Sequence, residues 1–324
     1  MLPDVIPLKP FLQEKIWGGR ELQKQFGKSL PEGKRIGESW EVSAYEGMES
    51  VVSGGDFEGW TLRRLVEAHG QELMGDRTYN RYDGEFPLLI KLLDAREDLS
   101  IQVHPDDSYV RENGLGNFGK MEAWYVLRSE NGRIAYGLNG EITKAEFEAA
   151  IEAGRVEDAV QFFDVQPGEV VFMPPGVVHA LCQGVMAYEV QQSSDVTFRI
   201  YDYGRPGDDG KPRELHIKQS LEVMEFGGDL RKPFRCEDLR NSETLVKSEH
   251  FELRHFQLEG DSVVHESGDS FSAVTFIAGS AEIAGKGGGL KVAGGDTILV
   301  PEGRKFKLVK QCSTAVEYLI SSVP

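Results

Sequence analysis

Apolar and polar residues alternate within short segments along most of the chain, which is the pattern of β-strands that bury one face. Three of these segments place polar side chains among apolar neighbours: Gln102 and His104 in SIQVHPDD, Glu122 in GKMEAWYVL, and His179 in PPGVVHAL. Gln102 and His104 are two residues apart, so they point to the same face of a strand. Glycine- and proline-rich turns separate the segments, and the whole pattern predicts an all-β protein.

Three regions interrupt this pattern with the periodicity of helices. Thr61 is a candidate N-cap for the segment LRRLVEAHG, and this helix is expected to end at the glycine that closes the segment. Thr143 and Glu146 form a capping box that opens a small helical insertion, with two short helices over residues 143–163. A third helix is expected near residues 217–224.

The turn sequence before His179 occurs twice, at a constant offset of 127 residues. Residues 165–176 read VQPGEVVFMPPG and residues 292–303 read VAGGDTILVPEG, with two glycines and a proline in the same places. Where the first copy has His179, the second has Phe306. The repeat predicts two copies of one architecture, of which only the first has the residues to bind a metal.

The repeat and the chain length together predict two domains. We expect a metal-bearing domain over residues 1–240, which includes the helical insertion, and a second, metal-free domain over residues 241–324. The boundary falls within a polar, aperiodic stretch at residues 226–243. A chain of 324 residues is long enough to bury a core in each domain.

The charge and the cysteine content narrow the classes of function and the location. A formal net charge of −17 argues against nucleic acid and against an anionic membrane surface as partners. No run of about 18 apolar residues and no signal peptide is evident, because the chain starts with MLPD and continues in polar sequence. The cysteines at positions 182, 236 and 312 are an odd number without paired spacing, which fits a reducing compartment, so a cytoplasmic protein is predicted.

Metal binding is the chemistry that best explains the polar residues on the strands. A single strand histidine is more often a core or surface residue than a ligand, but a carboxylate and two imidazoles are costly to bury unpaired among apolar side chains. A divalent metal would satisfy all of them. Two histidines and a glutamate, with glutamine as a fourth group, suit zinc with a position left open for a substrate. The candidate metal ligands are Gln102, His104, Glu122 and His179.

The turns around His179 resemble the second motif of the cupin barrel, and the segment with Gln102 and His104 resembles the first. Over nearly its whole length the chain resembles the type I mannose-6-phosphate isomerases of the short bacterial kind. The matching segments are IWGGREL, GESWEVS, FPLLIKLLDAREDLSIQVHPDD, GKMEAWYVL, PGEVVFMPPGVVHAL and SSDVTFRIYDYGR. The resemblance implies two cupin (jelly-roll) barrels with a small helical insertion, and one zinc ion per chain held by the four candidate ligands.

The resemblance also implies a catalytic site beside the metal. The catalytic residues that it implies are Arg199, Lys120 and Asp195, and the substrate-binding residues are Lys91, Lys120 and Arg199. Lysine and arginine suit a sugar phosphate, because nearby cations decide how an acidic protein binds an anion. Taken alone, Lys91 could also mark an edge strand, and Arg199 could form a surface salt bridge.

The reaction implied is the interconversion of mannose 6-phosphate and fructose 6-phosphate through an enediolate, with zinc as a Lewis acid and Arg199 stabilising the developing negative charge. The base is left open among Asp195, a metal-bound water and Glu189. Trp17 in IWGG is expected in the core rather than at the substrate entrance. Two alternatives remain, a metal-dependent cupin isomerase of another sugar phosphate such as glucose 6-phosphate, and a non-catalytic sugar-sensing cupin. The oligomeric state is not predicted.

Overall fold

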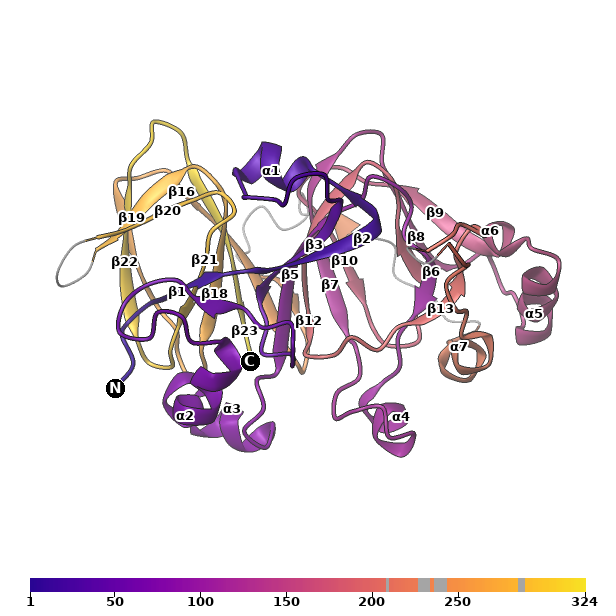
Figure 1. The fold of residues 1–324 in the computed structure, drawn as a ribbon, viewed down its shortest axis with the longest axis horizontal. Coiled ribbons are helices and arrows are strands. Elements are labelled where there is room, and N and C mark those ends of the chain that lie inside the picture. The colour runs from indigo at the N-terminus through magenta and orange to yellow at the C-terminus, as the bar shows by residue number, and fades with distance from the viewer. Residues whose placement is uncertain (208–209, 227–233, 236–243, 285–288) are drawn as a thin grey trace.

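Most of the chain forms β-strands, which are arranged in four antiparallel sheets (Figure 1). The computed structural model describes residues 1–207, 210–226, 234–235, 244–284 and 289–324. The protein is therefore mostly β, as predicted. The predicted domain boundary at residue 240 lies outside the described residues.

Two sheets make up the half of the molecule that carries the candidate ligands. The larger, here called the central sheet, has the strand order β14 (Phe234–Arg235), β10 (Glu169–Met173), β7 (Glu122–Ser129), β12 (Val185–Gln192), β5 (Leu88–Asp94), β3 (Ile36–Val42) and β2 (Phe11–Gly19). The smaller, the ligand sheet, has the order β13 (Phe198–Tyr201), β6 (Ile101–Val103), β11 (His179–Leu181), β8 (Arg133–Leu138) and β9 (Val160–Asp164). The two sheets enclose an apolar core that includes Trp124 and Val126 from the central sheet and Tyr136 and Leu181 from the ligand sheet.

Two further sheets make up the other half. The inner C-terminal sheet has the order β15 (Thr244–Lys247), β16 (Glu252–Leu258), β23 (Val316–Ser322), β18 (Ser272–Ala278), β21 (Thr297–Val300), β1 (Ile6–Lys9) and β4 (Val51–Val52). The outer C-terminal sheet has the order β17 (Ser262–Glu266), β22 (Lys305–Lys310), β19 (Ser280–Ala284) and β20 (Leu290–Ala293). Ile6 pairs with Leu299, so the first strand of the chain completes a sheet made mainly of its last third.

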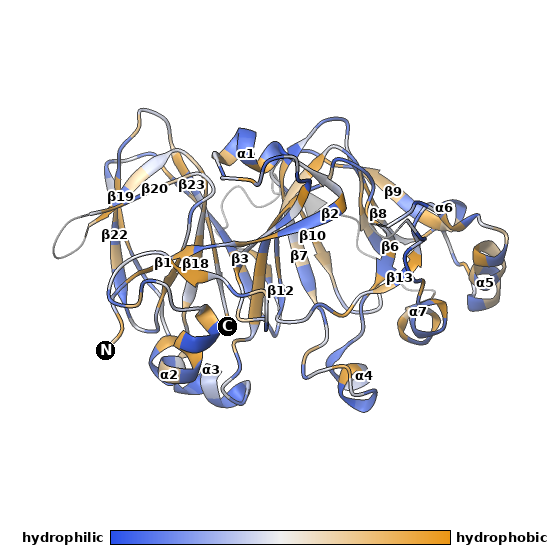
Figure 2. Ribbon diagram, in the orientation of Figure 1, coloured by the Kyte–Doolittle hydropathy of each residue, from blue (hydrophilic) through white to orange (hydrophobic). Residues whose placement is uncertain are grey.

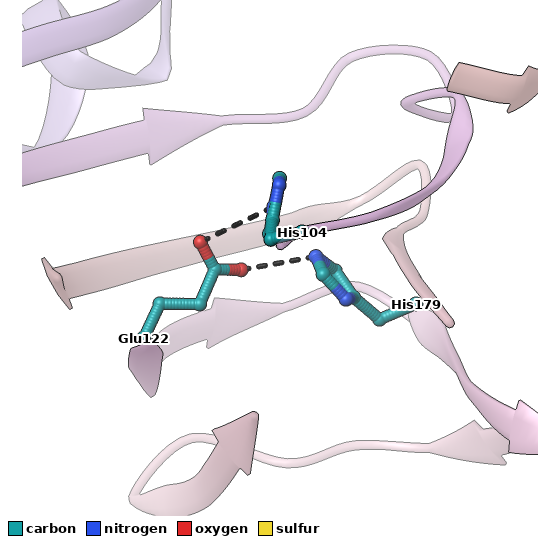
Figure 3. Close-up of side chains that lie close together, drawn as sticks. All are labelled: His104, Glu122 and His179. Atoms are coloured by element: carbon teal, nitrogen blue, oxygen red, sulfur yellow. Dashed lines mark ion pairs between the residues drawn. The ribbon is translucent and has the colours of Figure 1, made fainter. Parts of the chain in front are cut away.

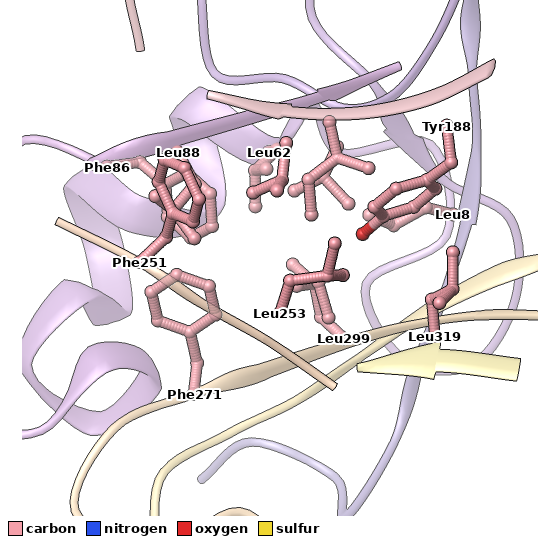
Figure 4. Close-up of a cluster of buried hydrophobic side chains, with 14 of the residues drawn as sticks. Leu8, Leu62, Phe86, Leu88, Tyr188, Phe251, Leu253, Phe271, Leu299 and Leu319 are labelled. Atoms are coloured by element: carbon pink, nitrogen blue, oxygen red, sulfur yellow. The ribbon is translucent and has the colours of Figure 1, made fainter. Parts of the chain in front are cut away.

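A large apolar core joins the two halves, between the central sheet and the inner C-terminal sheet (Figure 4). Leu88 and Tyr188 from the central sheet pack there with Leu253 and Leu319 from the inner C-terminal sheet. The Tyr188 hydroxyl lies 2.7 Å from Oγ of Ser321, so its polar end is paired across the core. Burying a side chain of this size contributes about 1.5–3 kcal/mol, and the shared core therefore holds the halves together.

The helices lie on the outside of the sheets (Figure 1). They are α1 (Glu21–Phe26), α2 (Leu62–Met74), α3 (Asp76–Arg81), α4 (Asp107–Glu112), α5 (Lys144–Glu152), α6 (Val156–Ala159) and α7 (Ile217–Val223). Figure 2 shows both hydrophobic and hydrophilic turns on α2, α5 and α7, as expected of helices with one buried face. The helices α5, α6 and α7 cover the outer face of the ligand sheet through Phe147, Val156 and Leu221. No helix among the described residues is long and apolar enough to cross a membrane.

The first helix differs from the prediction at its end. The Thr61 hydroxyl caps α2 as predicted, but the helix does not end at Gly70. It continues to Met74 across a kink at His69, whose backbone is not helical. A Cβ atom at Gly70 would lie 2.8 Å from the ring of Tyr79, so this glycine permits the close packing of α2 and α3 rather than ending the helix.

The helical insertion is shorter than predicted. The capping box of Thr143 and Glu146 is present and opens α5, but α6 ends at Ala159. The residues from Val160 onward form strand β9, so the expectation of helix up to residue 163 is wrong. Phe162 and Phe163 point into different cores on opposite faces of the ligand sheet, which a strand allows and a helix does not. The predicted third helix is confirmed as α7.

The two halves repeat one pairing pattern, in which His179 and Phe306 keep the offset of 127 residues seen in the sequence. In the first half β11 pairs with β6, and His179 lies opposite Gln102. In the second half β22 pairs with β17, and Phe306 lies opposite His265. The internal repeat therefore extends from the turn sequences to the register of the strands.

Candidate metal centre

Three of the predicted ligands meet between the central sheet and the ligand sheet (Figure 3). His104 directly follows β6, Glu122 begins β7, and His179 begins β11. One Glu122 oxygen lies 3.0 Å from Nε2 of His179, and the other lies 3.6 Å from Nε2 of His104. All three side chains are buried, and each offers one possible metal-ligating atom, which lies within 4.8 Å of the other two.

The backbone fixes which ring nitrogen of each histidine carries the proton. Nδ1 of His104 lies 3.0 Å from the carbonyl of Val196, and Nδ1 of His179 lies 2.9 Å from the carbonyl of Val177. A carbonyl only accepts, so each Nδ1 donates and each Nε2 presents a lone pair to Glu122. Nε2 of His104 and both Glu122 oxygens are buried without a hydrogen-bond partner. Converging buried acceptors of this kind fit a divalent cation.

Gln102 lies beside these three residues. It is opposite His179 in the strand register, and its amide nitrogen lies 3.5 Å from Nε2 of His179. The nitrogen and oxygen of an amide exchange places when the group turns by half a rotation, so the Gln102 oxygen can face the same centre. The fourth predicted ligand is therefore positioned beside the other three.

A lysine dominates the electrostatics of the centre. Nζ of Lys120 lies 3.3 Å from a Glu122 oxygen. Burial by itself raises the pKa of Glu122, but Lys120 and the imidazoles outweigh it and hold that pKa well below its usual range. Burial and the charge of Lys120 also hold the pKa of His104 well below its usual range. The carboxylate is ionised and the His104 imidazole is neutral, which are the forms that bind a metal.

Residues that pair across neighbouring strands form a row, here called a register row, that crosses the central sheet from the metal centre. Its members are Trp124, Glu189, Lys91 and Trp40. The Trp124 ring packs edge-on against His179, with ring centroids 5.5 Å apart, and its indole N–H donates to Glu189 at 2.7 Å. The other Glu189 oxygen forms an ion pair with Lys91 at 3.0 Å. Strand β5, which carries Lys91, lies between β12 and β3, so the edge-strand interpretation of this lysine is wrong.

Glu38 is a buried residue of the site that the sequence did not single out. Its carboxylate lies 3.8 Å from Lys91 and 3.1 Å from Lys15, and it accepts from the Trp40 indole at 2.6 Å. Burial by itself raises the pKa of Glu38, but the two lysines outweigh it and lower that pKa to about 2. The signal for it was available, because Glu38 and Trp40 alternate with other residues in GESWEV and so share a face.

Arg199 lies opposite Gln102 in the strand register. Its neighbours Phe198 and Ile200 pack toward the helices, so Arg199 points to the other face, toward the central sheet. Its guanidinium donates to the carbonyl of Glu214 at 2.8 Å, and its Nε is buried without a partner. Burial and the charge of Arg213 lower its pKa. Among the described residues no ion pair holds Arg199, so the structure does not support the alternative of a surface salt bridge.

Asp195 lines a cavity of about 560 Å³ at the end of the central sheet. The wall also includes Val196, whose carbonyl accepts from His104, so one residue of the wall contacts the candidate metal centre. Tyr45 lies in the same wall, and burial together with the charge of Asp195 raises its pKa. No sequence signal marked Tyr45, because it lies in a loop. Trp17 is buried in the core between the central and ligand sheets, as predicted.

Comparison with known proteins agrees with this geometry. Residues 5–138 match the family model for the catalytic domain of type I phosphomannose isomerase. The mannose-6-phosphate isomerase ManA of Bacillus subtilis is 36% identical over 98% of this chain and 100% of its own length. The mannose-6-phosphate isomerase of Streptococcus mutans is 38% identical over 85% of each chain.

Solved structures give the same result. The crystal structure of the mannose 6-phosphate isomerase from Bacillus subtilis matches with a TM-score of 0.87 at 32% identity, over 98% of this chain and 99% of that one. A phosphomannose isomerase from Salmonella typhimurium matches with a TM-score of 0.76 over 99% of this chain and 100% of that one, but at 16% identity this likeness shows the fold alone. Together with the sequence relatives, these matches show that the chain belongs to the type I phosphomannose isomerase family.

Proposed function

We propose that this protein is a zinc-dependent aldose–ketose isomerase that interconverts mannose 6-phosphate and fructose 6-phosphate. The observation that carries the proposal is the buried cluster of His104, Glu122 and His179, in which Nε2 of His104 and both Glu122 oxygens have no hydrogen-bond partner among the described residues. Membership of the phosphomannose isomerase family supports the choice of substrate.

In this proposal Gln102, His104, Glu122 and His179 hold one zinc ion per chain. The set of two imidazoles, a carboxylate and an amide suits zinc and leaves a position for substrate. When bound, the ion acts as a Lewis acid toward the sugar carbonyl. The second half supports the count of one, because Phe306 stands at the position of His179.

The cations beside the centre bind the anionic substrate. Lys120 and Lys91 are both buried, so their charges are poorly screened by solvent and attract the phosphate of the sugar. Arg199 has an unpaired Nε and a planar guanidinium, which suits a negative charge spread over two neighbouring oxygens. We assign it to the enediolate, whose charge appears only during the reaction.

Asp195 is the base in this proposal. It takes a proton from C2 of mannose 6-phosphate and returns it to C1, which converts the aldose into the ketose. Both oxygens of the alternative base Glu189 are already engaged, one by Lys91 and the other by Trp124. Asp195 lines the cavity, and its carboxylate has no hydrogen bond or ion pair with the described residues.

We further propose that the fold consists of two cupin barrels, each formed by two facing sheets. The repeat of the turn sequences and of the strand register supports this architecture. A cytoplasmic location stays a prediction from the cysteine usage.

A coupled assay with mannose 6-phosphate and glucose 6-phosphate side by side tests the function. We expect turnover of mannose 6-phosphate, with glucose 6-phosphate at least about 100-fold poorer in kcat/KM, since a site that hydrogen-bonds sugar hydroxyls rejects the wrong arrangement. Preferred turnover of glucose 6-phosphate would assign the protein to another sugar phosphate. Tight binding of both sugars without turnover would make it a sensor and overturn the proposal.

A further inference from the structure

The second half of the molecule contains a partly buried arginine that has no ion-pair partner among the described residues. Arg254 lies on β16 with its guanidinium 5.5 Å from the centre of the Phe256 ring. Its Nε is buried and makes no hydrogen bond, and no carboxylate among the described residues forms an ion pair with it. A buried N–H group without an acceptor is unfavourable, so the position of Arg254 calls for an explanation.

The repeat shows which residue of the first half Arg254 corresponds to. The register row of the first half runs through Val171, Trp124, Glu189 and Lys91. In the second half the row starts at Ile298, which is 127 residues after Val171, and runs through Val274, Ile320 and Arg254. Arg254 therefore stands where Lys91 stands, and Ile320 stands where its partner Glu189 stands. The second half has kept the cation and lost the carboxylate that neutralises it.

A second unpaired polar atom follows the same correspondence. Ser272 lies opposite Val300 in the second half, as Glu122 lies opposite Met173 in the first. Ser272 is 2% exposed, and its hydroxyl has no hydrogen-bond partner in the described part of the chain. The buried unpaired groups on Arg254 and Ser272 therefore occupy the positions that serve the proposed substrate site in the first half.

The charges in this region favour an anion over a metal. His265 stands where Gln102 stands, and its Nε2 lies 2.6 Å from the Tyr318 hydroxyl. Burial and the charge of Arg254 lower the pKa of His265 to about 4, so it is neutral near pH 7. With Ser272 and Phe306 in place of Glu122 and His179, the described residues around Arg254 offer a positive charge and no metal-binding set.

We propose that the second half binds a small phosphate-bearing anion through Arg254. A guanidinium presents a planar fork of donors that matches the oxygens of a phosphate group. The corresponding position in the first half belongs to the proposed sugar-phosphate site, so the ligand class is a sugar phosphate or free phosphate. The choice of ligand class rests on the proposed function, whereas the anion site itself rests on the surroundings of Arg254 and not on catalysis.

Thermal unfolding of the metal-loaded protein at increasing inorganic phosphate and constant ionic strength tests the proposal. In the wild type the Tm should rise by about 2–4 °C at ten times the dissociation constant. Arg254→Met should lose most of the rise that the second site contributes. Without phosphate this variant should be at least as stable as the wild type, because an unpaired cation has been removed. The matched control is Arg133→Met, since Arg133 also stands over an aromatic ring, 4.1 Å from the centre of Phe162.

Calorimetric titration with fructose 6-phosphate separates the two sites. We expect two binding events per wild-type chain and one per Arg254→Met chain, with kcat/KM for mannose 6-phosphate unchanged within about twofold. Binding of free phosphate but not fructose 6-phosphate at the Arg254 site would identify free phosphate as the ligand. An unchanged phosphate response in Arg254→Met, with lower stability in the absence of phosphate, would show that Arg254 only packs on Phe256 and would overturn the proposal. If the isomerase assay fails, the loss of one binding event in Arg254→Met relative to the wild type still tests the proposal.

Discussion

At the scale of single residues, the candidate metal centre is defined by acceptors that face one another. The carbonyls of Val196 and Val177 occupy the Nδ1 protons of the two histidines, so both Nε2 lone pairs converge on the Glu122 carboxylate. Each buried acceptor left unpaired costs about 1–3 kcal/mol. A bound cation therefore contributes stability as well as chemistry, which explains how such a group persists in an apolar core.

Arg199 separates substrate binding from catalysis. Arg199→Ala should keep its metal and its fold, and kcat should fall by about 10²- to 10³-fold, the range seen when one preorganised donor to a developing oxyanion is removed. Arg199→Lys should recover only part of the loss, because an ammonium cannot reproduce the planar fork. Steady-state kinetics and metal analysis of both variants provide the measurement. A rise in KM with kcat unchanged would show that Arg199 binds substrate and transition state equally, and would contradict its assignment to the enediolate.

The candidate ligands could be predicted because each lies on a strand whose alternation reveals its face. His179 was the clearest, since the repeat supplies Phe306 as a comparison within the same chain. The parts that could not be predicted depend on contacts between strands distant in sequence. Glu38 becomes part of the site only because β3 pairs with β5, and the sequence of either strand contains no information about that pairing.

At the scale of strands, the central sheet carries a row of alternating charges away from the metal centre. Glu189, Lys91, Glu38 and Lys15 alternate in sign, and successive members lie 3.0, 3.8 and 3.1 Å apart. Two indole N–H groups hold the carboxylates, from Trp124 to Glu189 and from Trp40 to Glu38. Removal of one member leaves an uncompensated buried charge, so the row acts as a unit.

Glu38 makes stability depend on pH in a defined window. Its pKa is about 2 in the folded protein, against an ordinary value of 4.5 for a glutamate side chain, so the fold favours the ionised form. The stabilisation is fully present above about pH 5 and is lost as the pH falls toward 2, with an upper limit of about 3 kcal/mol. Glu38→Gln should therefore be less stable than the wild type at pH 7, and the gap should narrow between pH 5 and pH 3.

Urea unfolding of the metal-free proteins across this range gives the measurement, since metal loss then plays no part. Glu67→Gln is the matched control, because the Glu67 side chain is 63% exposed and its ion pair with Arg63 is worth little. A gap between Glu38→Gln and the wild type that stays constant from pH 7 to pH 3 would show that Glu38 does not titrate as described.

The secondary structure was predictable where the local signal was decisive and failed where tertiary packing competed with it. The capping box of Thr143 and Glu146 began a helix as expected. Gly70 was expected to end α2, yet it lies against Tyr79 inside a kinked helix. The sequence of β9 predicts helix wrongly, because its alternation is short and it follows a helical segment directly.

At the scale of the whole molecule, one architecture occurs twice with different chemistry. The strand register repeats around the candidate metal centre, while ligand positions of the first half are occupied by His265, Ser272 and Phe306 in the second. The core between the halves is shared, and the N-terminal strand β1 completes a sheet of the second half. The repeat was visible in the sequence through its turns. The pairing of β1 with the second half was not visible in the sequence, because it depends on packing across the shared core.

Titration of zinc into metal-stripped protein, with mannose 6-phosphate isomerisation followed at each step, tests the central claim most directly. Activity should be absent without metal, rise in proportion to the zinc added, and reach its maximum at one equivalent per chain, because only the first half holds the complete set of ligands. His179→Ala should bind zinc much more weakly and recover little activity. Full activity in the stripped protein, or saturation only at two equivalents, would contradict a single catalytic metal centre at His104, Glu122 and His179.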